Sequence, residues 1–361
     1  SGATELVVEA TPALKAGQDV DIGWDISDAF VTEHDMAGTW KAFNGKWQAF
    51  FRRQVVAVSQ QQDKQVVTLD VPIRYPVKTR DKASLKVSSG WISEVGIERL
   101  SLSNAIEWND AWAHDQVSIL IMSGVKDGWL RQINSYAPDG IKDKGWMPSA
   151  HLQSGGIMVA DSKRITIEQC SMRNAQHRGS GGNGYLFEIR RSSEILTRDC
   201  EAESGRHNFI QNWGFGVSGC VWLRVVSKGG KALLGPNSDI GTLGYSEFHH
   251  SLAMSNLIDD SVFDDGWASQ NRGSYSSGAG HTATRNVMWR VQGAGIVKSF
   301  NYGQGYVIGT SPDLTVKTAL NASTKATVGT APEDFVEGLG QAADLRPKSL
   351  YEAQLKRRLE P

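Results

Sequence analysis

A short motif that recurs along the middle of the chain limits the possible folds more than any other feature. In ITIEQCSM, two apolar residues separated by one position are followed by two polar residues and a second apolar pair of the same kind. VGIERLSL and ILTRDCEA repeat the motif, and LRQINSY and VWLRVVSK follow it less completely. The third position of the motif is occupied by Leu100, Ile133, Cys170, Cys200 and Val226, with further candidates at Val262 and Val287. A loose repeat of roughly twenty to forty residues is typical of a solenoid.

Two short strands joined by a polar bend explain this motif, because side chains alternate between the two faces of a strand. The apolar side chains then fill the coil, and successive coils stack about 4.8 Å apart. This register places Cys170 against Cys200 and turns Lys228 inward unless its strand ends at Ser227. It predicts two outward rows of side chains, one formed by Asn134, Ser171, Glu201 and Ser227 and the next by Tyr136, Arg173, Glu203 and Gly229.

We therefore expect an all-β protein in which residues 91–310 form a right-handed parallel β-helix. An antiparallel sandwich is the alternative architecture. Residues 1–90 contain short alternating or β-branched runs bounded by Gly, Pro and Asp, and we interpret them as a β-rich insertion or capping region. Residues 311–361 are expected to form a C-terminal extension. Because Ser349 precedes Glu352 by one helical turn, the extension is predicted to end in a short helix.

The composition argues against two classes of partner. The net charge of the 361 residues is −1, so neither a nucleic-acid-binding surface nor attraction to an anionic membrane is expected. No apolar run approaches the length of about 18 residues that a membrane-spanning helix needs. Cys170, Cys200 and Cys220 lie in apolar, strand-like contexts and are interpreted as buried thiols. The opening Ser1-Gly2-Ala3 fits a processed N-terminus, so we expect a secreted or periplasmic protein, with a cytoplasmic one as the alternative.

Three features of the sequence resemble a known superfamily. These are the coils ITIEQC and ILTRDC, the Gly-rich turns between them, and the segment GRHNFIQNW at residues 205–213. They look like bacterial right-handed β-helix proteins of the pectate-lyase-like superfamily. The resemblance implies a polysaccharide lyase, glycoside hydrolase or epimerase, or a relative among phage tailspikes and adhesins. It includes no catalytic motif of one particular lyase family, so any function taken from it is an analogy.

The densest polar cluster is DCEAESGRHN, residues 199–208. With Cys200 and Ala202 inward, Glu201 and Glu203 share the outer face. Their Cα atoms then lie about 6.6 Å apart. Together with Asp199 these carboxylates can hold Ca²⁺, the only cofactor we expect, because this cation prefers oxygen ligands. In a hydrolase the same pair can act as acid and base. A solvated strand face with ordinary surface acids is the alternative.

The cluster also contains candidates for acid–base chemistry. β-Elimination from a uronate needs a cation that stabilises the carboxylate and a base that takes the C5 proton. Arg173 and Arg206 are candidates for the cation. His207 is the preferred base and Lys228 its substitute, because imidazole titrates near neutral pH whereas lysine must first be desolvated. The segment YSEFHH, residues 245–250, is a weaker candidate for a second wall or a metal site.

Side chains suited to sugar recognition surround this cluster. Tyr185 and Trp213 offer aromatic faces, and Asn183, Asn208 and Gln211 can bind hydroxyl groups, although any single ring could instead serve packing. We therefore expect an enzyme that cleaves an acidic polysaccharide by β-elimination. The alternatives are a glycoside hydrolase or fructan-converting transferase, and a non-catalytic carbohydrate-binding or adhesin β-helix.

Overall fold

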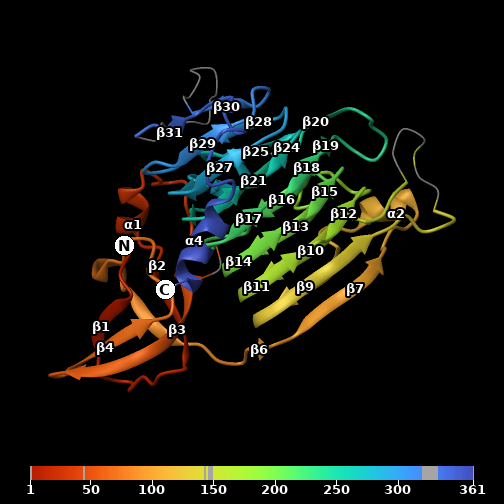
Figure 1. Cartoon of the computed structure of the whole chain (residues 1–361). Helices are drawn as coiled ribbons and strands as arrows, with labels where there is room; N and C mark the ends of the chain where they lie inside the picture. The colour runs from red at the N-terminus through yellow and green to blue at the C-terminus, as the bar shows by residue number, and fades with distance from the viewer. Residues whose placement is uncertain (1, 44, 142–143, 145–148, 319–331, 361) are drawn as a thin grey trace.

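The chain folds into a parallel β-helix with a smaller antiparallel sheet against its side (Figure 1), which confirms the predicted fold class. The computed structural model describes residues 2–43, 45–141, 144, 149–318 and 332–360. Two parallel sheets form the walls of the β-helix, and the larger wall has 14 strands. Its strands are β6 (Ile92–Ser93), β7 (Gly96–Leu102), β9 (Val125–Ser135), β11 (Lys163–Glu168), β12 (Ser171–Arg173), β14 (Ser193–Arg198), β15 (Glu201–Glu203), β17 (Val221–Leu223), β18 (Val226–Lys228), β23 (Leu257–Asp259), β24 (Val262–Phe263), β27 (Val287–Val291), β29 (Tyr306–Thr310) and β31 (Phe335–Glu337).

The smaller wall has eight strands, and the connections between the walls carry short elements. Its strands are β8 (Ser118–Ser123), β10 (Gly155–Ala160), β13 (Tyr185–Arg190), β16 (His207–Gln211), β21 (Ser246–Phe248), β25 (Gly266–Ser269), β28 (Ile296–Ser299) and β30 (Thr315–Lys317). The connecting elements are α2 (Trp108–Ala113), α3 (Tyr275–Gly278), the antiparallel pair β19 (Lys231–Leu233) and β20 (Gly241–Leu243), and the parallel pair β22 (Ala253–Met254) and β26 (Ala283–Thr284).

The recurring motif forms a strand, a bend and a second strand. The bend residue has a positive φ in successive coils, as at Gln169 (54°) and Asp199 (53°). The apolar positions of ITIEQCSM are at most 1% exposed and belong to a core that runs through the coils. Cys170 and Cys200 stack as predicted, and the Cys170 backbone N–H donates to Cys200 Sγ at 3.5 Å. The motif therefore indicates correctly which side chains fill these coils.

The predicted register is wrong at VWLRVVSK and at both further candidates. Val262 pairs with Val226 and shares its outward position, and Val287 pairs with Leu257 on the first strand of its coil. Glu201 pairs with Val226, so Val225 takes the inward position that we assigned to Val226. Ser227 is consequently buried and does not belong to the outward row, whereas Lys228 points outward beside the glutamates. The local reason is that VWLRVVSK contains two adjacent valines, and the first of them follows the bend into the core.

The N-terminal region forms a separate five-stranded antiparallel sheet along the side of the coil stack. It contains β1 (Glu5–Glu9), β2 (Asp19–Asp25), β3 (Trp47–Gln61), β4 (Lys64–Leu69), β5 (Ser84–Val87), helix α1 (Asp28–Glu33) and a 3₁₀ turn (Thr79–Asp81). Its core includes Phe215 from the β-helix. Hydrogen bonds reach it from several coils: Lys163 Nζ to Arg53 O at 2.6 Å, Ser218 Oγ to Phe50 O at 2.9 Å and Trp40 Nε1 to Ala279 O at 2.8 Å. The sheet therefore covers the flank of the β-helix.

The C-terminal helix α4 (Leu350–Leu359) forms as predicted, with Ser349 Oγ accepting the backbone N–H of Glu352 at 3.0 Å. It docks on the larger wall, where Asp259 accepts hydrogen bonds from Ser349 Oγ and from the backbone of Leu350 and Tyr351. The strands β30 and β31 continue the parallel pairing past residue 310. The last coil therefore lies within residues 311–361, which the sequence assigned to an extension.

Two further expectations concern the cysteines and the membrane. Cys170, Cys200 and Cys220 are buried and free, as expected. Among the residues that the structure describes, no helix combines the length and the apolar character needed to cross a bilayer.

Candidate functional site

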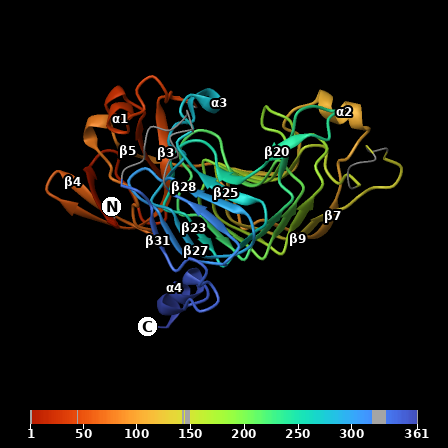
Figure 2. The same cartoon turned by 90° about the horizontal axis from the view of Figure 1, so that it is seen from above.

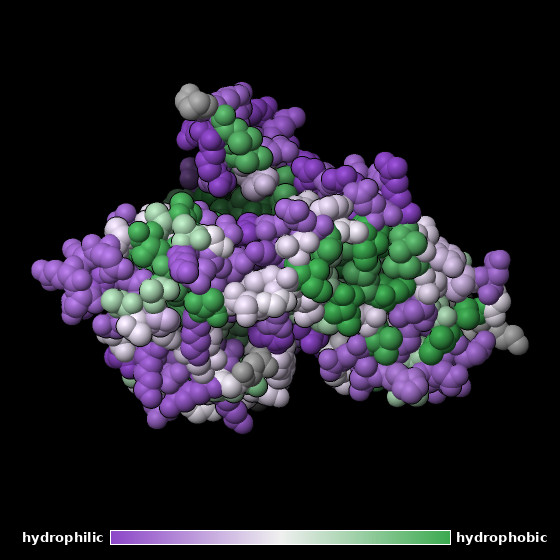
Figure 3. Space-filling model, turned by 90° about the horizontal axis from the view of Figure 1, so that it is seen from below, coloured by the Kyte–Doolittle hydropathy of each residue, from purple (hydrophilic) through white to green (hydrophobic). Residues whose placement is uncertain are grey.

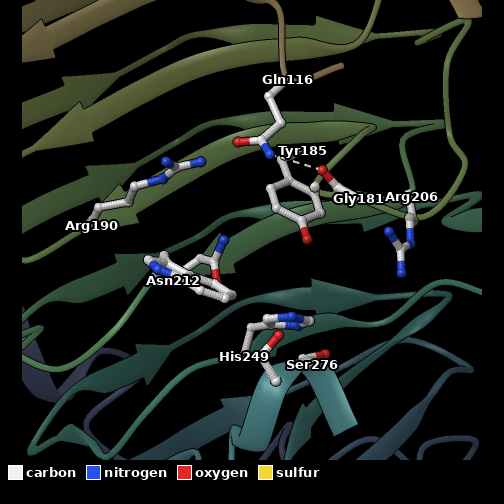
Figure 4. Close-up of a pocket in the computed structure, with 11 residues that line it drawn as sticks. Gln116, Gly181, Tyr185, Arg190, Arg206, Asn212, His249 and Ser276 are labelled. Atoms are coloured by element: carbon white, nitrogen blue, oxygen red, sulfur yellow. Dashed lines mark hydrogen bonds between the residues drawn. The ribbon is translucent and has the colours of Figure 1, made fainter. Parts of the chain in front are cut away.

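A polar pocket lies on the outer face of the smaller wall. Seen from above, this wall lies between one raised edge formed by α1, β3 and α3 and another formed by α2 and β20 (Figure 2). The pocket has a volume of about 460 Å³. Its lining residues come from the smaller wall and from loops at both edges: Gln116, Gly181, Gly182, Tyr185, Arg190, Arg206, Asn212, Trp213, His249, Ser276 and Ser277 (Figure 4).

Parallel stacking of coils brings these side chains together. Tyr185 on β13 pairs in register with His207 on β16, and β16 pairs with β21, which carries Glu247. The turn that contains Ser276 closes one side. Arg272 Nη2 donates to Ser276 Oγ at 3.0 Å, and both Ser276 and its neighbour have positive φ values (53° and 62°). A non-glycine residue held in this region stores strain that is common at ligand sites.

Glu247 is the centre of a buried ionic cluster beneath the pocket. Arg272 Nη1 donates to Glu247 Oε2 at 2.9 Å, and His249 Nδ1 hydrogen-bonds to Glu247 Oε1. His207 Nε2 lies 3.3 Å from the same oxygen. Burial alone would raise the pKa of Glu247, but His207, Arg272 and His249 together hold that pKa below its ordinary value. Glu247 is therefore a carboxylate at neutral pH.

The two imidazoles of this cluster are neutral, and both carry their proton on Nδ1. Burial lowers the pKa of His207 to about 3 and also lowers the pKa of His249, against the opposing effect of Glu247. His207 Nδ1 lies 2.6 Å from the carbonyl oxygen of Tyr245, which can only accept, so the proton is on Nδ1. Its Nε2 has no hydrogen-bond partner. His249 donates from Nδ1, so its Nε2 carries the lone pair at the pocket.

Two arginines lie on opposite sides of Tyr185 (Figure 4). Arg190 is held by Glu188 through two hydrogen bonds of 2.6 and 3.0 Å. Arg206 donates from Nη1 to the Gly179 carbonyl at 2.8 Å and has no ion pair with any carboxylate of the described residues. Arg206 is therefore the guanidinium group that remains available to an anionic ligand. Burial raises the pKa of Tyr185, so its hydroxyl group stays protonated.

A second charged cluster lies on the outer face of the larger wall. Glu201 accepts from Arg173 Nη2 at 2.5 Å and from Lys228 Nζ at 2.7 Å, and Glu203 lies 3.8 and 3.6 Å from the same two cations. Asp199 instead pairs with Arg224. Each carboxylate proposed from the sequence as a Ca²⁺ ligand thus already has a cationic partner. The Ca²⁺ site stays a prediction, and it requires these ion pairs to open.

The structure separates the residues that the sequence grouped into one groove. Tyr185, Arg206 and Trp213 line the pocket and His207 lies next to it, whereas Arg173 and Lys228 belong to the other wall. Asn183, Asn208 and Gln211 are completely buried. They serve the fold, because Asn183 binds the backbone of Gln116, Asn208 binds Asp265 and Gln211 binds the carbonyl of His250. They therefore do not face the pocket as sugar-binding groups.

The sequence reasoning missed several pocket residues or ranked them low. Glu247 and His249 belong to the segment considered a weaker candidate, whereas Arg190 and Arg272 were not considered. The signal for Arg190 was the EIR sequence on β13, in which Glu188 and Arg190 share one face. For Arg272 the sequence contained no comparable signal. This residue lies in the loop between β25 and α3, and the path of that loop brings it to Glu247.

Comparisons with known proteins add little to this description. Neither a protein-family model nor a curated protein matches the chain. Among solved structures, the chain is similar to the tailspike protein gp49 from Pseudomonas phage LKA1, with 12% identity and a TM-score of 0.31. The matched region covers 95% of this chain and 65% of the tailspike chain. Likeness at this level supports no conclusion about function, and the assignment of the β-helix rests on the strand pairing itself.

Proposed function

We propose that the pocket over the smaller wall binds an acidic polysaccharide and that the protein cleaves this polymer by β-elimination. The observation that carries the proposal is the convergence of Arg206, Tyr185 and His249 on one cavity (Figure 4). These three side chains supply the cation, the proton donor and the base that elimination from a uronate requires. A secreted or periplasmic location would give such an enzyme access to its polymer and remains a prediction.

The proposed reaction begins at the C5 carbon of the uronate. Arg206 pairs with the uronate carboxylate and stabilises the charge that develops when the C5–H bond breaks. His249 Nε2 takes this proton, and Glu247, hydrogen-bonded to Nδ1–H, stabilises the resulting imidazolium. A double bond forms between C4 and C5 as the C4–O bond to the leaving sugar breaks. Tyr185 donates its phenolic proton to the leaving oxygen and later regains one from solvent.

The base in this proposal is His249 and no longer His207. His207 is fixed by the Tyr245 carbonyl, and its free nitrogen faces Glu247, whereas the ring of His249 lines the pocket. Elimination is also favoured over hydrolysis. Glu247, beneath the pocket, is hydrogen-bonded to the Arg272 guanidinium group and has a lowered pKa, which disfavours the protonated carboxyl that a glycosidase needs.

The test is an assay of uronate polymers followed by the ultraviolet absorbance of the unsaturated product. We expect His249→Ala to lower kcat by about 100-fold or more, the range lost with a general base. Arg206→Ala should lower kcat/KM strongly, and Arg206→Lys should recover part of it. Circular dichroism and the thermal midpoint verify that each variant is folded.

Lys228→Ala is the matched control, because this cation lies on the other wall and served as the substitute base in the sequence interpretation. Activity lost in Lys228→Ala but kept in His249→Ala would move the catalytic site to the larger wall. New reducing ends without the absorbance would indicate hydrolysis. The absence of both products, with polysaccharide binding retained, would indicate a non-catalytic carbohydrate-binding protein.

A further inference from the structure

Beneath the pocket, three side chains on adjacent strands place potential metal-ligand atoms close together. One nitrogen each of His207 and His249 and one oxygen of Glu247 all lie within 4.8 Å of one another. All three residues are buried, with side chains 9%, 6% and 2% exposed. His207 Nε2 is directed toward Glu247 at 3.3 Å and has no hydrogen-bond donor or acceptor of its own.

One separation in the cluster suits a metal ion bound through short bonds, whereas the hydrogen bond between His249 Nδ1 and Glu247 Oε1 has to open before both atoms can bind the ion. In a tetrahedral zinc site, bonds of about 2.0–2.1 Å separate neighbouring ligand atoms by roughly 3.3 Å. The separation between His207 Nε2 and Glu247 Oε1 has this value. Without a metal ion, His207 Nε2 has no partner. A cation placed between this nitrogen and the carboxylate oxygen would bind both atoms.

The surroundings of the cluster resemble those that hold metal ligands in place. His207 donates its other ring N–H to the Tyr245 carbonyl at 2.6 Å, and the second oxygen of Glu247 is fixed by Arg272. A backbone carbonyl on the distal nitrogen of a histidine, and a hydrogen bond to the distal oxygen of a carboxylate, are the usual second contacts of such ligands. Three protein ligands leave a fourth coordination position for water.

We propose that His207, Glu247 and His249 form a binding site for Zn²⁺ and that the bound ion inhibits the protein. Two imidazoles with one carboxylate select a borderline-soft cation such as Zn²⁺, whereas Ca²⁺ prefers six to eight oxygen ligands. The inhibitory effect rests on the proposed function. A metal ion on His249 Nδ1 leaves the ring proton on Nε2, so the imidazole has no lone pair for the C5 proton of the substrate.

Arg272 limits the affinity of this site, because its guanidinium group lies against Glu247 and repels a divalent cation. The site therefore suits reversible occupancy better than a permanent structural ion. Replacement of Arg272 by Gln, which keeps a donor for Glu247 Oε2 and removes the charge, should tighten Zn²⁺ binding several-fold.

The binding experiment uses the full chain after dialysis against a chelator. Calorimetric titration with ZnCl₂ should give one site per chain, and titration with CaCl₂ should give no saturable binding at this cluster. Co²⁺ should develop the visible absorption bands of a four-coordinate site. His207→Gln should raise the Zn²⁺ dissociation constant at least tenfold, whereas His177→Gln, the control, should leave it unchanged. His177 is also buried and pairs with one carboxylate, that of Asp115, but belongs to no three-residue cluster of the described residues.

Three results would overturn the site: no one-to-one binding, binding that His207→Gln does not weaken, or anomalous diffraction from zinc-soaked crystals at another position. The anomalous measurement uses the unaltered protein, so it decides the question even if a variant fails to fold.

Measurements of activity with and without Zn²⁺ test the inhibitory effect separately from the existence of the metal site. In the uronate assay, kcat should fall in proportion to Zn²⁺ occupancy and recover when a chelator is added. Activation by Zn²⁺ would overturn the inhibitory role and the assignment of His249 as the base, while leaving the metal site intact. If the protein cleaves no polymer, the proposed function and the inhibitory effect both fail, and the binding arm alone decides whether the site exists.

Discussion

Asp19 shows how single buried charges join the two parts of the molecule. It lies on β2, and its carboxylate oxygens lie 2.6 Å from Lys163 Nζ and 2.6 Å from Lys126 Nζ, both on the larger wall. Lys163 is 1% exposed. Burial alone would raise the pKa of Asp19, but hydrogen bonds from Lys126 and Lys163 lower it overall. This ion pair therefore links the N-terminal sheet to the β-helix.

We expect Asp19→Ala to destabilise the protein by about 3–5 kcal/mol, because it leaves the ammonium group of Lys163 buried without its counter-charge. The double variant Asp19→Asn/Lys163→Met should lose less, since it removes both charges. Urea unfolding monitored by tryptophan fluorescence measures both effects. A loss below about 1 kcal/mol in Asp19→Ala would indicate that water or a relaxed side chain replaces the pair.

The lowered pKa of Asp19 also predicts a dependence on acid. A carboxyl whose pKa falls on folding contributes stability above its unfolded value of about 3.9, and this contribution is lost as the pH falls through the folded pKa. Between about pH 6 and pH 3, the wild-type protein should therefore lose more unfolding free energy than Asp19→Asn/Lys163→Met. Equal losses in both proteins would assign the acid sensitivity to other carboxyl groups.

At the scale of elements, α4 is held by polar contacts at its N-terminal end, which include an ion pair between Glu352 and Arg224. None of its residues is buried, and an isolated helix of its ten residues is marginal in water. Its first turn is held by Asp259, which accepts from Ser349 Oγ at 2.7 Å and from Tyr351 N at 2.8 Å. The helix therefore forms because its N-terminus is docked on β23.

We expect Asp259→Ala to release α4 without unfolding the β-helix. Lys356, Arg357 and Arg358 lie in its last turn, so trypsin should cleave there much faster in this variant. Asp264→Ala is the matched control, because Asp264 is an exposed acid that follows β24 on the same coil. Unchanged cleavage in Asp259→Ala would show that other contacts hold the helix.

The two walls differ in how far the sequence predicts them. The larger wall has a core on one face and solvent on the other, so its motif alternates. The predicted register fails from the double valine onward, at Val226, Val262 and Val287. The smaller wall lacks this signal, because β16 (HNFIQ) is buried along its whole length. From the sequence we therefore expected His207 to lie just after the end of a strand, whereas it is the first residue of β16. Tyr185, Arg206 and Trp213 were found because they lie near one another in sequence, whereas Arg272 joins the site only through coil stacking.

At the scale of the whole molecule, the first coil leaves one end of the β-helix open. The strands β7 and β8 begin the two walls, and every residue of β7 except the last is exposed. Ile92 and Ile121 are 55% and 56% exposed, and Ile97 and Leu100 about two-fifths. Figure 3 shows a broad apolar patch on the half of the molecule that contains this coil. An open edge with apolar neighbours is a template for pairing with another chain.

We therefore expect the isolated protein to associate with itself as its concentration rises, through the end of the coil stack. The double substitution Ile92→Lys/Ile121→Lys places two charges beside this edge, and repulsion should shift sedimentation velocity profiles toward the monomer. Because both side chains are more than half exposed, the thermal midpoint should change little. Val7→Lys is the control, since Val7 is 60% exposed on the N-terminal sheet, away from the coil end. Association that persists in the double variant, or that Val7→Lys abolishes, would place the contact elsewhere.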